Sequence, residues 1–152
     1  MIRLLLARGA EGLPSPTPIA FDQGFGLPPS PNTCLLAPAG ASLPAHGRFG
    51  PWHVSAGRLW DMVQEVAAAE PRCFPLASWP DLRQAQWVVR SRLMNDPDIV
   101  VAQVMAMEAT GGAAALSHGL VLYSRSLVGW SDLGVNAGRL ARWRAGIERR
   151  LG

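Results

Sequence analysis

The sequence predicts an α+β fold: a curved antiparallel sheet packed on a long C-terminal helix, preceded by an extended, proline-rich N-terminal arm. Stretches with strand character follow one another between residues 85 and 126, separated by short turns, as in an antiparallel meander. Residues 137–151 carry an apolar stripe at helical spacing. Prolines crowd residues 9–51, where they disfavour helices and central strands. We therefore divide the chain into an arm, residues 1–48, and a single α+β domain, residues 49–152.

The composition excludes several broad classes of protein. Of 152 residues, 49% are hydrophobic and 16% charged, so the chain can bury a core and is not wholly disordered. The net charge of +3, carried by arginines alone, is too small to indicate nucleic-acid binding. The three histidines are scattered, which argues against a metal site. Cys34 and Cys73 can form at most one disulfide, and the sequence leaves their pairing open.

The first eight residues bear on location. Their apolar run is too short for the core of a signal peptide, and a membrane-spanning helix needs about 20 residues. We therefore expect a soluble, cytoplasmic protein, for which peripheral contact with a membrane surface remains open.

The arm is expected to be extended and to lie on the domain. Proline lacks an amide hydrogen and restrains the residue before it to extended geometry. Ile19, Phe21 and Phe25 are nevertheless apolar enough to dock on a core. Residues 34–36 are a candidate short edge strand. A flexible linker is the alternative interpretation of the same composition.

The first helix is predicted after Ser55, whose side chain can cap the first turn. Glu70 should end this helix because a residue that precedes proline is pushed out of helical geometry. Residues 49–54, just before it, are a candidate short strand. The apolar face of the helix is formed by Leu59, Trp60, Val63, Val66 and Ala67.

The strands of the meander follow this helix. Residues 85–92 alternate in character, and residues 99–108 are apolar on almost every position. The turns between strands are expected at residues 95–98 and 110–112, the second being rich in glycine. The stretches with strand character are residues 73–77, 85–92, 99–108 and 113–126.

The last helix, residues 137–151, is expected to have a core edge and a basic edge. At 100° per residue, the core edge spans an arc of about 80° and the basic edge an adjoining arc of roughly 100°. The core edge consists of Leu140, Trp143, Ile147 and Leu151, and the basic edge of Arg139, Arg142, Arg149 and Arg150.

This order of elements resembles the helix-grip arrangement of START-like and TATA-binding-protein-like folds. Residues 53–61 resemble the way in which START-like chains enter their first helix. The likeness concerns the fold and implies no activity, because one fold supports many functions.

Residues 123–136, with the sequence YSRSLVGWSDLGVN, carry the most specific motif. They closely resemble the domain-of-unknown-function 1499 family, whose members end in a strand with R-S-x-S-R-x-G-x-S-D-L-G-V-N and then a basic helix. Residues 90–98 resemble the family's R-S-x-x-x-x-x-D-D segment, and residues 31–34 its P-N-x-C segment. The resemblance covers about residues 31–150. It implies a fold and no reaction, since the family has no established activity.

The polar residues of these segments form the candidate site: Arg90, Arg92, Arg125, Ser126, Trp130, Asp132, Asn136 and Arg139. Two interpretations fit them. In the first they are a structural latch, in which Asp132 pairs with Arg125 or Arg90 and Asn136 caps the last helix. In the second they form an anion pocket, in which arginines, loop amides and the helix N-terminus bind a carboxylate or phosphate. Trp130 either anchors the loop by burial, the favoured interpretation, or lines the pocket.

We expect a non-catalytic binding domain for a small anionic or amphipathic ligand. The alternative is a protein-interaction or membrane-surface scaffold that uses the basic edge of the last helix. An enzyme has less support because no nucleophile–base pair, phosphate-binding loop or dinucleotide fingerprint occurs. No cofactor and no metal are expected, and the oligomeric state is open.

Overall fold

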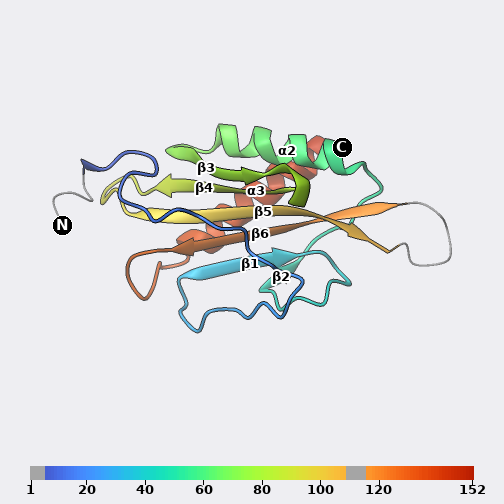
Figure 1. Cartoon of the computed structure of the whole chain (residues 1–152), viewed down its shortest axis with the longest axis horizontal. Helices are drawn as coiled ribbons and strands as arrows, with labels where there is room; N and C mark the ends of the chain where they lie inside the picture. The colour runs from blue at the N-terminus through green and yellow to red at the C-terminus, as the bar shows by residue number, and fades with distance from the viewer. Residues whose placement is uncertain (1–5, 109–115) are drawn as a thin grey trace.

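The computed structural model describes residues 6–108 and 116–152 and shows an α+β fold built on one six-stranded mixed sheet (Figure 1). The strands lie in the order β2-β1-β6-β5-β4-β3. They are β1 (Thr33–Ala37), β2 (Gly47–Arg48), β3 (Cys73–Trp79), β4 (Gln84–Arg90), β5 (Pro97–Met107) and β6 (Ser117–Ser126). The helices are α2 (Ala56–Ala69) and α3 (Val135–Leu151), with a 3-10 turn, η1, at Pro80–Leu82. The predicted α+β class, with a C-terminal helix on the sheet, is confirmed.

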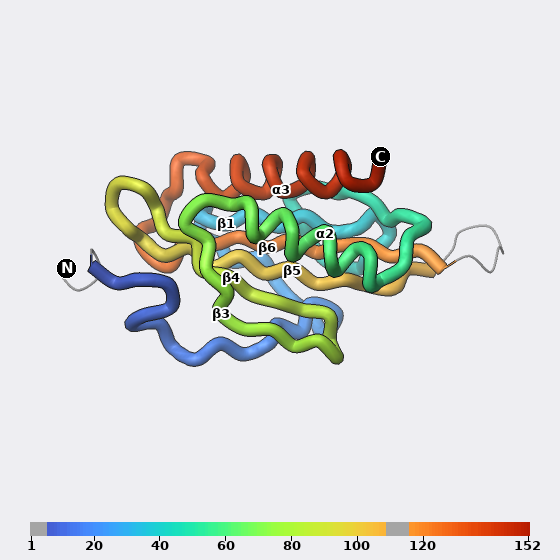
Figure 2. Tube along the Cα trace, turned by 90° about the horizontal axis from the view of Figure 1, so that it is seen from above, coloured from blue at the N-terminus to red at the C-terminus, as the bar shows by residue number. Residues whose placement is uncertain are grey.

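The two faces of the sheet are covered by different parts of the chain. Helices α2 and α3 pack on one face, and the N-terminal segment, residues 7–32, crosses the other (Figures 1 and 2). Strand β5 shows the consequence: Val100 and Ala102 pack with the helices, whereas Ile99 and Val101 pack with the N-terminal segment. A strand covered on both faces favours apolar residues at most positions, which explains why β5 is apolar apart from Asp98 and Gln103.

The two predicted helices are present. Ser55 Oγ accepts a hydrogen bond from the amide of Arg58 at 3.1 Å, and α2 ends before Glu70, as predicted. Helix α3 begins two residues earlier than predicted, at Val135. Leu140, Trp143 and Ile147 of its apolar stripe are buried. No helix within residues 6–108 or 116–152 combines the length and apolar character that crossing a membrane requires.

The sheet departs from the prediction on its β1 side. We predicted an antiparallel sheet with residues 34–36 as an edge strand, but β2 lies outside β1 and runs parallel to it, with Leu36 opposite Gly47. Residues 38–46 carry the chain back along β1, so both strands point the same way. The amide of His46 donates to the carbonyl of Leu35 at 2.8 Å and holds this return.

The predicted strand at residues 49–54 is wrong. Only Trp52 pairs there, in an isolated antiparallel bridge with His118. Pro51 has no amide hydrogen to donate to a ladder, which explains why pairing does not extend. The strand predicted from residue 73 is longer than expected and runs to Trp79. The predicted turn at residues 110–112 lies outside the described residues, as does the start of the strand predicted from residue 113.

Polar side chains of β4 hold the N-terminal segment on the sheet. Gln84 accepts from the amide of Ile19 and donates to its carbonyl, both at 2.8 Å, in the manner of a neighbouring strand. Gln86 donates to the carbonyl of Thr17 at 3.0 Å. Phe21 is buried and packs edge-on against Tyr123 of β6. The segment thus closes over the sheet without forming a strand of its own.

Candidate functional site

The structure divides the predicted site residues among several places. Successive residues of a strand face opposite sides of a sheet, so Ser124 and Ser126 of β6 face α3 while Arg125 faces the N-terminal segment. Ser126, Asp132, Asn136 and Arg139 come together, and the other four predicted residues lie elsewhere.

Asn136, fully buried in the first turn of α3, is the centre of a polar network. Its side-chain amide donates to the carbonyl of Asn32 at 3.0 Å, to Ser126 Oγ at 2.8 Å and to Asp132 Oδ2 at 2.6 Å. Asn32 precedes β1 and Ser126 ends β6. One side chain therefore joins two strands, the loop and the helix, and we call these contacts the Asn136 network.

Arg139 extends this network into a buried ion pair. Asn136 Oδ1 accepts from Ser124 Oγ at 2.5 Å and from Arg139 Nη1 at 2.9 Å. Arg139 Nη2 lies 2.8 Å from Asp98 Oδ2, and both side chains are at least nine-tenths buried. Its Nε is 3.8 Å from Glu70 Oε1 and makes no hydrogen bond within the described part of the chain. Burial raises the pKa of the Asp98 carboxyl, and the Arg139 guanidinium counteracts this rise.

Asp132 caps the last helix. Its Oδ1 accepts from the amide of Gly134 at 2.8 Å and its Oδ2 from the amide of Asn136 at 3.0 Å. Partial burial acts to raise the pKa of Asp132, but these hydrogen bonds and that from the Asn136 side chain leave it lowered. The expected pairing of Asp132 with Arg125 or Arg90 is wrong: no such ion pair occurs among the described residues. Asn136 was expected to cap the helix but instead lies inside it.

The remaining predicted residues do not converge. Arg90 is only 2% exposed, because its guanidinium donates to the carbonyl of Gly9 at 2.9 and 3.1 Å under the N-terminal segment. Arg92 is exposed. Trp130 is 66% exposed, so the favoured prediction that it anchors the loop by burial is wrong. Its carbonyl, rather than its ring, makes a contact, accepting from Ser30 Oγ at 3.0 Å.

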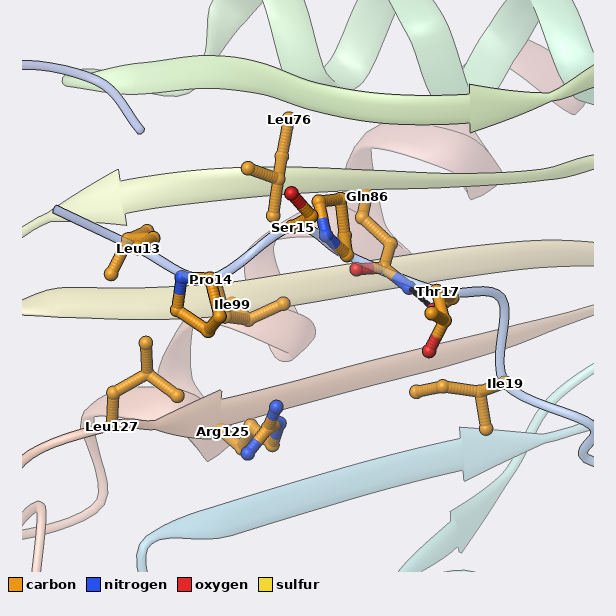
Figure 3. A pocket seen from close by; sticks show the side chains of 11 residues that line it. Leu13, Pro14, Ser15, Thr17, Ile19, Leu76, Gln86, Ile99, Arg125 and Leu127 are labelled. Carbon is orange, nitrogen blue, oxygen red and sulfur yellow. Dashed lines mark hydrogen bonds between the residues drawn. The ribbon is translucent and has the colours of Figure 1, made fainter. Parts of the chain in front are cut away.

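Arg125 lines a cavity of about 220 Å³ between β6 and the N-terminal segment (Figure 3). The side chain is half-buried, and its guanidinium has no hydrogen-bond or ion-pair partner within residues 6–108 and 116–152. Burial raises the pKa of Tyr123, and the nearby positive charge of Arg125 counteracts this rise. The other walls are Leu13, Pro14, Ser15, Pro16, Thr17, Ile19, Leu76, Gln86, Ile99 and Leu127. The cavity thus places one cationic group among walls that are polar and apolar in nearly equal measure.

The predicted basic edge of α3 is smaller than expected. Arg139 belongs to the core, not to this edge. Arg142 donates to Glu70 at 3.1 Å, and Arg150 to Glu65 at 2.9 Å, so carboxylates of α2 offset two of the three remaining charges.

Both cysteines are free thiols. Burial, followed by the neighbouring Glu70 carboxylate, raises the pKa of Cys73 to about 12, so its thiolate is scarce at neutral pH. No group of three or more histidine, cysteine or carboxylate side chains suited to a metal ion occurs in the described residues.

Sequence reasoning missed four partners of Asn136 and Arg139, which are Asn32, Glu70, Asp98 and Ser124. Strand alternation could have shown that Ser124 and Ser126 share a face opposite Arg125. Nothing local marks Asp98 or Asn32 as partners of α3, because their contacts span 41 and 104 residues of sequence.

Comparisons with known proteins give no relative to set beside this geometry: no family model and no curated protein matches the chain.

Proposed function

We propose that this chain is a non-catalytic binding domain for a small amphipathic anion, whose charged group pairs with Arg125 while its apolar part lies against the cavity walls. The observation that carries the proposal is the half-buried guanidinium of Arg125, which has no partner among the described residues and lies in a cavity with several aliphatic walls.

The electrostatics of this cavity favour an anion. A charge that is partly removed from water is unfavourable unless it is paired. The other buried arginines of the candidate site, Arg90 and Arg139, satisfy this requirement with carbonyls and carboxylates of the chain itself. Arg125 has no such partner in the part of the chain that the structure describes, and a guanidinium can bind a carboxylate or phosphate through two parallel hydrogen bonds. A ligand carboxylate would thus supply the partner that the described residues do not provide.

The walls favour a ligand with a hydrocarbon part. Leu13, Ile19, Leu76, Ile99 and Leu127 present aliphatic side chains to the space, as Figure 3 shows. A fully polar anion would leave these surfaces unused. We therefore expect short-chain or aromatic carboxylates to bind better than inorganic phosphate or sulfate.

Isothermal titration calorimetry with a panel of aliphatic and aromatic carboxylates, organic phosphates and inorganic phosphate tests this proposal. Arg125→Gln should weaken binding of the best carboxylate at least about tenfold, which corresponds to about 1.4 kcal/mol. Arg92→Gln, which changes an exposed arginine outside the cavity, is the matched control and should leave binding unchanged. The proposal fails if no member of the panel binds, or if Arg125→Gln binds as tightly as the natural sequence.

The alternative scaffold function has less support. It needs a strongly basic helix edge, and Glu65 and Glu70 offset part of that charge.

We further propose that the chain shares the helix-grip arrangement and the domain-of-unknown-function 1499 family suggested by its motif. Helix α2, the antiparallel run β3–β6 and α3 on the sheet support the first idea. The second is supported by the role of the motif, since the Asn136 side chain donates to both Ser126 and Asp132. A crystal structure of a family member should contain the same network; a different arrangement of these side chains would oppose the assignment.

A further inference from the structure

Exposed apolar side chains gather in two loops. Of eleven large apolar side chains exposed among the described residues, seven lie in the β4–β5 turn, in the β6–α3 loop and at the start of α3. We call this set the apolar tip; it consists of Leu93, Met94, Leu127, Val128, Trp130, Leu133 and Val135. A concentration of this kind usually marks a surface that contacts another phase or molecule.

Both loops lie at the same end of the molecule. Arg90 pairs with Pro97 where β4 turns into β5, and the amide of Leu127 donates to the carbonyl of Pro97 at 3.2 Å. Figures 1 and 2 show the two loops at one end of the longest axis, beyond the ends of β4 and β6. The apolar tip therefore lies at one end of the molecule, where the N-terminal segment also contacts the β4–β5 turn through Ala7.

The exposed apolar side chains of the tip do not stabilise the fold itself. Leu133 is 95% exposed and has a φ of 55°, a left-handed conformation that costs a non-glycine residue roughly 1–2 kcal/mol. Its neighbour Asp132 caps α3, so the loop shape has a structural purpose, but a polar residue at position 133 would serve that shape better. The same holds for the ring of Trp130, which is 66% exposed.

We propose that the apolar tip enters the interfacial layer of a lipid bilayer. A pair of loops at one end of the molecule can insert among lipids without the matching concave surface that a protein partner would need. Tryptophan is enriched at membrane interfaces, where its apolar ring and its N–H group are both accommodated. The exposed Arg92, beside Leu93, can reach phosphate groups above the apolar layer.

The charge of the two loops determines which lipids the apolar tip should bind. The turn and the loop carry one arginine, Arg92, and two carboxylates, Asp96 and Asp132, of which Asp132 is held by the cap of α3. With no net positive charge, the apolar tip has no electrostatic preference for anionic lipid, and binding depends on insertion of apolar side chains. Vesicles of zwitterionic phosphatidylcholine should therefore be enough, and salt should not release the protein.

The apolar tip is continuous with the cavity. Leu127 belongs to the tip and also lines the cavity beside Arg125. If the proposed function holds, this continuity identifies the ligand class as lipid-derived carboxylates, which would enter from the bilayer with the carboxylate directed at Arg125. This ligand class rests on the proposed function, whereas insertion of the tip does not.

Sedimentation with phosphatidylcholine vesicles in 0.1 and 0.5 M NaCl tests the insertion. The natural sequence should bind at both salt concentrations, and Leu133→Asp should bind at least tenfold more weakly. Leu82→Asp is the matched control: Leu82 is 50% exposed but precedes β4 and so lies at the opposite end of the sheet. The Leu82→Asp variant should bind vesicles like the natural sequence. All variants should unfold at the same temperature as the natural sequence.

Quenching of tryptophan fluorescence by brominated phosphatidylcholine locates the contact. The natural sequence should be quenched, and Trp130→Phe, which retains the other five tryptophans, should lose this quenching. Absence of vesicle binding, equal loss in Leu82→Asp, or release by salt would overturn the proposal. The proposal would also fail if sedimentation velocity showed self-association that Leu133→Asp abolishes, because the tip would then contact a second copy of the chain. Arg125→Gln should retain vesicle binding, so failure of the proposed ligand and failure of the tip are separate results.

Discussion

Replacing Asn136 by alanine tests whether the Asn136 network holds the last helix on the sheet. The side chain is completely buried and makes five hydrogen-bonding contacts, of which its two N–H hydrogens and two oxygen lone pairs can satisfy four at a time. Alanine removes all five but leaves the backbone amide of residue 136, which still donates to Asp132. The substitution also improves helix propensity slightly, so any loss of stability comes from the network and not from the helix itself.

The expected loss of unfolding free energy depends on which hydrogen bonds the partners of Asn136 retain. The carbonyl of Asn32 still accepts from the amide of Ser126, and Ser124 Oγ still accepts from Arg139. No strongly buried partner is left wholly unsatisfied, so each lost bond counts at the ordinary net value of about 1 kcal/mol and not at the larger penalty for an orphaned group. The four hydrogen bonds that the side-chain amide can make at one time together give roughly 4 kcal/mol. For a chain of this length, that corresponds to a fall in Tm of about 8–16 °C.

Urea and thermal unfolding followed by circular dichroism would measure this loss. Val135→Ala is the control, because Val135 is 51% exposed in the same helical turn and should change stability by less than about 0.5 kcal/mol. Asn136→Asp places an oxygen where the amide now donates to Asp132. This substitution should therefore lower the stability more at pH 7 than near pH 4, where a proton shared between the new carboxyl and that of Asp132 relieves their repulsion. A loss below about 1 kcal/mol in Asn136→Ala would refute the central role of this side chain.

Three further changes test other contacts. Asp132→Asn removes the charge and one of the two acceptor oxygens, so it should cost about 1 kcal/mol at pH 7. Because the folded-state pKa of Asp132 is lowered, its contribution is present above its unfolded pKa of about 3.9 and is lost as pH falls through the folded pKa; unfolding curves from pH 7 to 2 should show this decline only with aspartate. Gly119→Ala should lose about 1–3 kcal/mol in urea unfolding, since a Cβ there would lie 2.4 Å from Cγ of Pro38; Gly57→Ala, with no neighbour within 4 Å, should lose nothing. Arg90→Met should speed thermolysin cleavage within the N-terminal segment, and unchanged cleavage would show that Arg90 does not hold it.

Local patterns were sufficient for the elements that the sequence predicted correctly. Helix α2 has a serine cap, an apolar face and a proline stop, each of which acts within a few residues. The stripe of α3 and the strand character of β4, β5 and β6 are likewise properties of neighbouring residues. Errors arose where the outcome depends on distant pairing. Residues 49–54 have strand character, but a proline interrupts them, and only Trp52 finds a partner, 66 positions away at His118.

The candidate site shows the same limit. The sequence located the segment that matters, residues 123–139, and offered a latch or an anion pocket as alternatives. Strand alternation places Ser126 and Arg125 on opposite faces of β6, so the motif contributes separately to a buried network and to a cavity. Which arginine is paired depends on Asp98 and on the N-terminal segment, whose positions come from other strands.

The sequence by itself determined the α+β class, the two helices and their buried faces, because periodicity and capping act over one or two turns. Only the tertiary structure decided that Arg139 is buried against Asp98, that Arg90 is covered by the N-terminal segment, and that Arg125 alone among these three faces a cavity. The three arginines are chemically identical, and what separates them is the partner that each meets once distant strands have paired.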